Sequence, residues 1–197
     1  MIKAIIFDLN GVLIQSPNLS DRFEKKFNVA VEDFLLALKD IMAETRKPNA
    51  RGAFVCWKPY LEKWSVRLSK KEFFDFWFSE EKENSDLIEL AKKLNKNKIK
   101  LFILSNNFSE RAVYYKKRFD FLNIFDKIYY SWQTGFIKPN PEAFINLLSE
   151  NKLKPQECIY FDNSEENIEV ADSLGIKSFI YEGVDGVRAV LLDQKLL

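Results

Sequence analysis

Residues 3–13, KAIIFDLNGVL, decide the fold, because four consecutive apolar residues lead directly to Asp8. A continuous apolar run of this length is typical of a strand buried on both faces, as in a parallel sheet. Three further runs have the same form, at residues 100–104, 157–161 and 177–181. The sequence therefore predicts several buried parallel strands.

Helical patterns lie between these runs. Residues 86–94 place Leu87, Leu90, Ala91 and Leu94 on one helical face, and residues 142–148 and 165–174 are also expected to be helical. Gly175 is expected to end the last of them. Strands that alternate with helices predict an α/β fold, a doubly wound parallel sheet covered on both faces.

The stretch from residue 16 to residue 84 interrupts this alternation. It has helical periodicity and many aromatic residues, such as Phe34, Trp57 and Phe73, but no buried-strand run. We expect an inserted helical domain at 16–84, with an α/β core built from 1–15 and 85–197. The aromatic residues are expected to form the core of a small bundle, with some of them open to a role in lining a pocket.

Composition excludes several classes of function. The 197 residues include 30 basic and 29 acidic side chains, so the net charge of +1 favours neither nucleic acid nor an anionic membrane surface. Histidine is absent, which excludes a Ser-His-Asp triad and any histidine-ligated metal.

The apolar run before Asp8 is shorter than the roughly 7–15 residues of a signal-peptide core. Cys56 and Cys158 are expected to be free thiols of a cytoplasmic protein.

Four polar residues stand either at the end of a predicted strand or in a loop between two strands. They are Asp8, Ser105, Lys138 and Asp162. Each alone is compatible with a helix cap, a turn or a solvated surface. The carboxyl ends of parallel strands meet at one crevice, however, so together they predict a phosphoryl-transfer site. In it, Asp8 attacks phosphorus, Asp8 and Asp162 hold Mg²⁺, Lys138 offsets negative charge and Ser105 donates to phosphoryl oxygens.

Four motifs resemble those of the haloacid dehalogenase superfamily, most of whose members are phosphatases. They are FDLNGVL (7–13), ILSN (103–106), GFIKPNPEAF (135–144) and IYFDNSEENIEVADSLG (159–175). The resemblance implies an aspartyl-phosphate on Asp8, a Mg²⁺ cofactor, a small phosphorylated metabolite as substrate, and an insertion that acts as a substrate-selecting helical cap. It also implies substrate contacts from Ser105, Asn106 and Lys138. A monomer or a homodimer is compatible with it.

Two positions depart from the family pattern. Asn10 stands where most of these phosphatases have an acid/base Asp, although its backbone carbonyl can still bind the metal. Asn163 stands where a second Asp is usual, which we expect to weaken Mg²⁺ binding. Because the family's true 2-haloacid dehalogenases lack the acidic residue at the position of Asp162, its presence favours phosphoryl chemistry over dehalogenation.

Asn10 leaves three interpretations open. An amide has no titratable proton, so the general acid–base contribution, typically about 10²–10⁴-fold, is lost from this position. The chain is then a slow or specialised phosphatase, a non-catalytic protein that binds a phosphorylated ligand, or an engineered Asp-to-Asn variant of an active phosphatase. Within the insertion, Arg46, Lys47 and Arg51 form a basic segment that either contacts a second anionic group or faces solvent.

Overall fold

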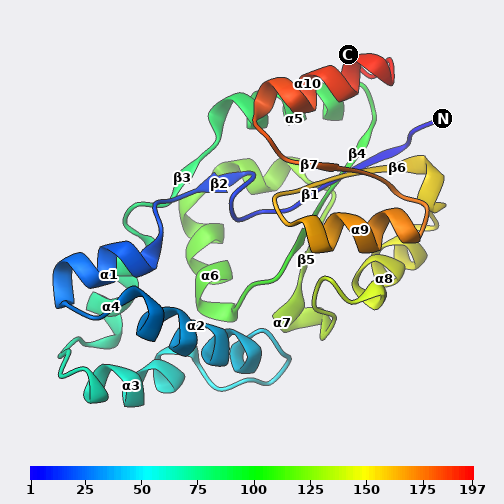
Figure 1. The fold of residues 1–197 in the computed structure, drawn as a ribbon. Helices are drawn as coiled ribbons and strands as arrows, with labels where there is room; N and C mark the ends of the chain where they lie inside the picture. Colours follow the sequence, from blue (N-terminus) through cyan, green and yellow to red (C-terminus); the bar gives the residue numbers. More distant parts are fainter.

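A computed structural model describes residues 1–197 and contains a five-stranded parallel sheet (Figure 1). The strand order is β5-β4-β1-β6-β7. The strands are β1 (Ala4–Phe7), β4 (Lys100–Ser105), β5 (Lys127–Tyr130), β6 (Cys158–Asp162) and β7 (Lys177–Ile180). The four runs predicted as strands are confirmed. The edge strand β5 has no counterpart among them, because two of its four residues are not buried and its apolar run is correspondingly weak.

Helices cover both faces of the sheet, which confirms the doubly wound arrangement (Figure 1). One apolar cluster joins Ile5 and Phe7 to α5 (Ser85–Lys96), α6 (Ser109–Arg118) and α10 (Val184–Asp193). The other joins Ala4 and Ile6 to α8 (Pro141–Asn151) and α9 (Glu165–Ser173). Successive β1 side chains thus enter opposite cores, as the alternation of a strand requires. The short helices are α7 (Ser131–Thr134) and the 3₁₀ turns Asp120–Ile124 and Pro155–Glu157.

Residues 16–84, where the sequence predicts a helical insertion, contain α1 (Leu19–Phe27), α2 (Val31–Thr45), α3 (Ala53–Lys63) and α4 (Lys70–Phe78). These helices enclose an aromatic core of their own that includes Phe34, Trp57 and Phe73, each less than 1% exposed. The expectation that the aromatic residues build this core is confirmed. Two short strands, β2 (Ile14–Gln15) and β3 (Lys82–Glu83), pair antiparallel where the chain enters and leaves the insertion.

Two contacts tie the insertion to the α/β core. Phe108, which directly precedes α6, packs into the aromatic core of the insertion, with its ring centroid 5.2 Å from that of Trp77. The Ala53 N–H at the start of α3 donates to Glu110 Oε1 of α6 over 2.9 Å. The insertion is therefore held against the end of the sheet at which β1 and β4 terminate (Figure 1).

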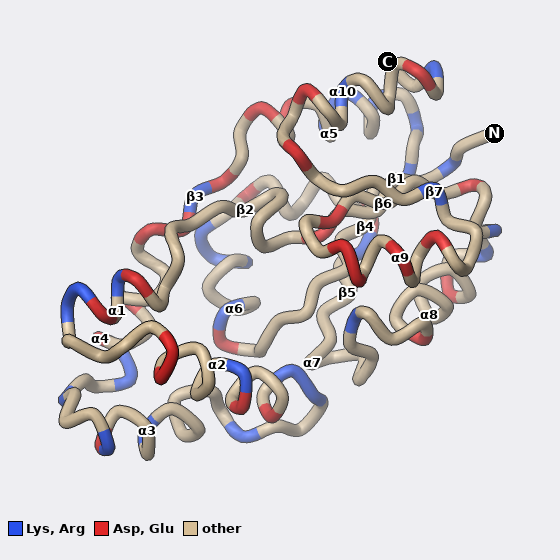
Figure 2. The backbone as a smooth tube through the Cα atoms, in the orientation of Figure 1, with Lys and Arg blue, Asp and Glu red and all other residues tan.

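Charge and thiols follow the sequence-based expectations. Basic and acidic residues are both spread over the chain, although α9 carries acidic residues only (Figure 2). Cys56 and Cys158 are both free, and burial raises the pKa of the Cys158 thiol to about 12. None of the helices combines the length and the apolar character that a membrane span requires.

Candidate active site

The register of the sheet brings the two predicted carboxylates together. Phe7 pairs with Phe161, so Asp8 and Asp162 leave the neighbouring strands β1 and β6 at the same level. The Asp8 backbone N–H donates to the Phe161 carbonyl over 2.9 Å, which holds the start of the loop to the end of the sheet. Both carboxylates are buried, with Asp8 7% and Asp162 1% exposed.

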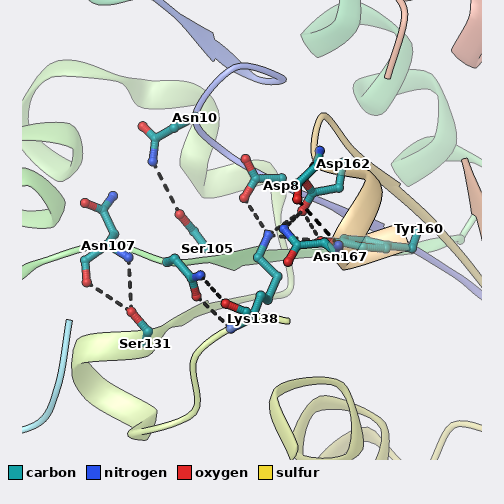
Figure 3. A network of polar contacts seen from close by, with 11 residues as sticks. Asp8, Asn10, Ser105, Asn107, Ser131, Lys138, Tyr160, Asp162 and Asn167 are labelled. Atoms are coloured by element: carbon teal, nitrogen blue, oxygen red, sulfur yellow. Dashed lines mark hydrogen bonds and ion pairs between the residues drawn. The ribbon is translucent and has the colours of Figure 1, made fainter. Parts of the chain in front are cut away.

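Lys138 joins these two carboxylates (Figure 3). Its Nζ lies 2.7 Å from Asp8 Oδ1 and 2.6 Å from Asp162 Oδ2. The Asn106 side chain fixes the lysine loop, because its Nδ2 donates to the Lys138 carbonyl over 2.7 Å and its Oδ1 accepts the Lys138 N–H over 2.9 Å. Asn106, expected to bind substrate, thus also positions the lysine.

Asp162 is the most extensively hydrogen-bonded member of the site. Its Oδ2 accepts from Lys138 Nζ, from the Tyr160 hydroxyl and, over 3.0 Å, from Asn167 Nδ2. Its Oδ1 accepts the Ser164 backbone N–H over 2.8 Å. These donors fix the position and orientation of the carboxylate.

The ion-paired cluster carries one positive and two negative charges, because the Lys138 ammonium pairs with both Asp8 and Asp162. Burial raises the pKa of Asp8; the Lys138 ammonium opposes this shift, and the Asp162 charge adds to it. Burial and the two nearby carboxylates also raise the pKa of Tyr160 well above its usual value, so its hydroxyl stays protonated and donates.

Removing the ammonium leaves two buried negative charges without a counter-charge. We expect Lys138→Met to lower the free energy of unfolding by about 3–5 kcal/mol, the usual cost of breaking a buried pair from one side. Denaturant unfolding of the variant measures this loss. Lys117→Met, at an exposed position that makes no ion pair, is the control and should change stability by less than about 0.5 kcal/mol. A comparable small change for Lys138→Met would contradict the assigned role.

Asn10 contacts the side chains of Tyr115 and Ser105, the second of which is drawn in Figure 3. Its Oδ1 accepts the Tyr115 hydroxyl proton over 2.6 Å, and its Nδ2 lies 3.5 Å from Ser105 Oγ. The amide is thereby oriented, with its oxygen toward α6 and its NH₂ toward Ser105. Burial raises the pKa of Tyr115 well above its usual value, so this hydroxyl remains a donor.

A cavity of about 190 Å³ opens at these residues and has no hydrophobic lining residue. The residues that line it are Asp8, Asn10, Arg46, Asn106, Arg111, Lys138, Asp162, Asn163, Ser164 and Asn167. Ser105 is 2% exposed and is not among them, so it contacts Asn10 behind the cavity wall. The structure brings the other predicted site residues together at this cavity.

Asn163 packs directly on the loop that follows β1. A Cβ placed on Gly11, whose φ is +92°, would lie 2.3 Å from Asn163 Nδ2. Only glycine therefore permits both this backbone conformation and this contact. The Asn163 amide, the Asn10 backbone and the Asp8 carboxylate are consequently gathered on one side of the cavity.

Several site residues escape prediction from sequence. Tyr160 stands two residues before Asp162 in β6, and this spacing on a strand is a signal that places both side chains on one face. Asn167 lies in the first turn of α9, the helix that follows β6. Tyr115 and Arg111 lie on α6, where no motif marks them, because their roles depend on how α6 packs beside the loop of Asn10.

Comparison with known proteins identifies the class to which this fold and site belong. The family model described as haloacid dehalogenase-like hydrolase matches residues 2–175, so the chain belongs to this family of hydrolases. The phosphorylated carbohydrates phosphatase of Thermotoga maritima is 27% identical over 205 residues, which cover 100% of this chain and 90% of that protein.

Solved structures agree with this assignment. A haloacid dehalogenase family enzyme of Bacteroides thetaiotaomicron, bt-2542, has a TM-score of 0.82 and 26% identity, over 96% of this chain and 98% of that one. The same enzyme in complex with magnesium and inorganic phosphate has a TM-score of 0.79 and 26% identity, over 92% and 95% of the two chains. The chain is thus a phosphatase-type hydrolase by family.

Proposed function

We propose that this protein hydrolyses a small phosphate monoester through an aspartyl-phosphate on Asp8. The observation that carries the proposal is the Lys138 ammonium, within 2.7 Å of the Asp8 carboxylate at the wall of a wholly polar cavity. A phosphate dianion approaching Asp8 meets negative charge, and Lys138 is placed to offset it.

The proposed reaction has two steps. An Asp8 oxygen forms a bond to phosphorus as the ester P–O bond breaks, and the leaving oxygen takes a proton from water, because Asn10 has none to give. A second water then attacks phosphorus as the bond between Asp8 and phosphorus breaks, which restores the carboxylate and releases inorganic phosphate. The proton that this water loses neutralises the hydroxide left by the first step. The Asn10 NH₂ can orient phosphoryl oxygen by hydrogen bonding, since its own oxygen is already bound to Tyr115.

The residues of the site fit Mg²⁺ in kind, because the cavity is lined by carboxylate and amide oxygens, the donors that this ion prefers, and contains no histidine or cysteine. In the proposal, Asp8, the Asn10 backbone carbonyl and the Asn163 amide oxygen hold the ion, which would neutralise phosphoryl charge. Asp162, expected from sequence to be a ligand, joins them through Oδ1, which accepts only the Ser164 N–H and keeps a lone pair, while its Oδ2 holds Lys138. Asn163 in place of a second Asp predicts modest affinity.

Metal removal tests this assignment. We expect chelation to abolish phosphate release and added Mg²⁺ to restore it. Asn163→Asp, which adds a carboxylate beside Asp8, should tighten Mg²⁺ binding by about tenfold or more, as measured by calorimetry without substrate. Full activity in chelator, together with no gain in affinity for Asn163→Asp, would overturn the metal assignment.

A non-catalytic phosphate-binding protein is the second candidate, favoured by the amide at position 10. Phosphate release and intact mass, measured with Mg²⁺ and a panel of phosphate esters, separate the candidates. Release above background supports the phosphatase, and a covalent phosphate adduct without release shows a stalled second step. Tight binding with neither release nor adduct supports the binding protein.

A further inference from the structure

Arg46 reaches the catalytic cavity from the helical insertion. It ends α2, and its side chain lines the cavity together with Asp8 and Lys138. The guanidinium makes no hydrogen bond or ion pair with the protein, and its Nε is buried without a partner. A buried cationic donor left unpaired is costly, which indicates that a ligand completes its contacts.

The other cations at the cavity already have partners. Lys138 bonds to Asp8 and Asp162, and Arg111 Nε donates to Glu81 Oε1 over 2.8 Å. Burial, followed by the Arg111 charge, lowers the pKa of Arg46, while the Asp8 charge opposes the shift to a smaller extent. Arg46 is therefore the one cavity-lining cation that no side chain neutralises directly.

The surroundings of Arg46 leave only the cavity as the source of a partner. On its other side lies a groove whose remaining lining is mainly apolar and includes Leu38, Met42 and Ile137. Lys47 and Arg51, its neighbours in the basic segment, are exposed and do not line the cavity. The segment thus divides into one inward-facing arginine and two solvent-facing cations.

The loop that carries Arg46 is anchored to the core on both sides. Pro48 Cγ lies 3.4 Å from the position that a Cβ on Gly135 would occupy, close to the lysine loop. The Ala53 N–H bonds to Glu110. These contacts hold the backbone of the loop close to the core, so that Arg46 is presented to the cavity from the side of the insertion.

We propose that Arg46 binds a second anionic group on the substrate, so that the preferred substrates are short phosphate esters carrying a carboxylate or a second phosphate. This inference rests on the proposed function. Displacement at phosphorus is in line, so the leaving group points away from Asp8 and toward the insertion. A guanidinium there matches an oxyanion in bidentate geometry. The cavity, about 190 Å³, is below the roughly 300–1,000 Å³ of sites for drug-sized ligands, which restricts the leaving group to a few atoms.

The test compares substrates of equal chain length. Phosphoglycolate carries a carboxylate, 1,2-ethanediol bisphosphate a second phosphate, and 2-hydroxyethyl phosphate neither. We expect kcat/KM for at least one of the first two to exceed that for the third by about 10- to 100-fold, the value of a charged hydrogen bond. The better substrate of phosphoglycolate and the bisphosphate shows whether Arg46 prefers a carboxylate or a phosphate.

Variants at position 46 test whether Arg46 causes the preference for esters that carry a second anionic group. Arg46→Gln should lower kcat/KM for the preferred ester about 10- to 100-fold more than kcat/KM for 2-hydroxyethyl phosphate, and Arg46→Lys should retain part of the preference. Arg51→Gln, in the same segment but exposed, should behave as wild type. Equal losses for all three esters in Arg46→Gln, or no preference in the wild type, would overturn the inference and leave the phosphatase proposal standing.

Binding measurements test the role of Arg46 even if the protein hydrolyses none of the three esters. If no ester releases phosphate, the proposed function fails, and calorimetry of the same three esters with wild type and Arg46→Gln still tests Arg46. Tighter wild-type binding of a probe with a second anionic group than of 2-hydroxyethyl phosphate, lost in the variant, supports the inference. Equal affinities for all three probes overturn it.

Discussion

Asp8→Asn abolishes phosphate release while the protein remains folded. The substitution keeps the size of the side chain but removes the nucleophilic oxygen charge that the proposed mechanism requires. Loss of a nucleophile in a hydrolase typically costs about 10⁴- to 10⁶-fold in kcat. Phosphate release under saturating substrate and Mg²⁺ measures the loss, and intact mass should show no covalent phosphate on the variant.

The stability of the same variant separates a catalytic effect from unfolding. Burial raises the pKa of Asp8, Lys138 opposes that shift and Asp162 adds to it, so the ionised carboxyl is held in the folded state against a desolvation cost. Asn at this position leaves Lys138 paired one-to-one with Asp162, 2.6 Å away. We therefore expect an unchanged or raised melting temperature. Retained turnover in a folded Asp8→Asn protein would eliminate the covalent mechanism.

The parts of the fold that sequence predicts are those that burial fixes. The runs ending at Phe7 and Phe161 are apolar throughout because both faces of the central strands lie in cores. The edge strands β5 and β7 each have one neighbour in the sheet and begin with an exposed lysine, and the sequence predicts only β7, so burial marks the central strands and not the edges. Gly175 follows α9, as the sequence predicts, and its φ of +85° is the left-handed conformation in which glycine commonly ends a helix.

The site is predictable where residues follow strand ends and unpredictable where it depends on packing between distant segments. Asp8 and Asp162 meet because β1 and β6 are parallel and in register. Tyr115 reaches Asn10 across 105 positions of sequence, and no local pattern encodes that contact. Likewise, nothing in the sequence distinguishes Arg46 from Lys47, since only the path of the loop after α2 turns one inward and the other outward.

Asn10→Asp raises turnover by about 10²–10⁴-fold, the usual contribution of a general acid–base group. The site can accept the carboxylate, because the Tyr115 hydroxyl that donates to Asn10 Oδ1 over 2.6 Å would donate equally to Asp. The second oxygen would replace the NH₂ that now faces Ser105, whose hydroxyl can reverse and donate. The chain has no histidine to substitute for the missing acid, so the gain should appear in kcat for esters with poor leaving groups.

Leaving-group dependence shows whether the gain comes from proton transfer. An aryl phosphate leaves without much protonation, so Asn10→Asp should accelerate its first step far less than that of an alkyl phosphate. Asn28→Asp, an exposed change of the same kind outside the cavity, controls for the added charge. Equal rates for Asn10→Asp and wild type on alkyl phosphates would mean that this site does not depend on an acid at position 10. The missing Asp would then be a feature of an enzyme whose substrate or bound water supplies the proton, rather than the reason for slow turnover.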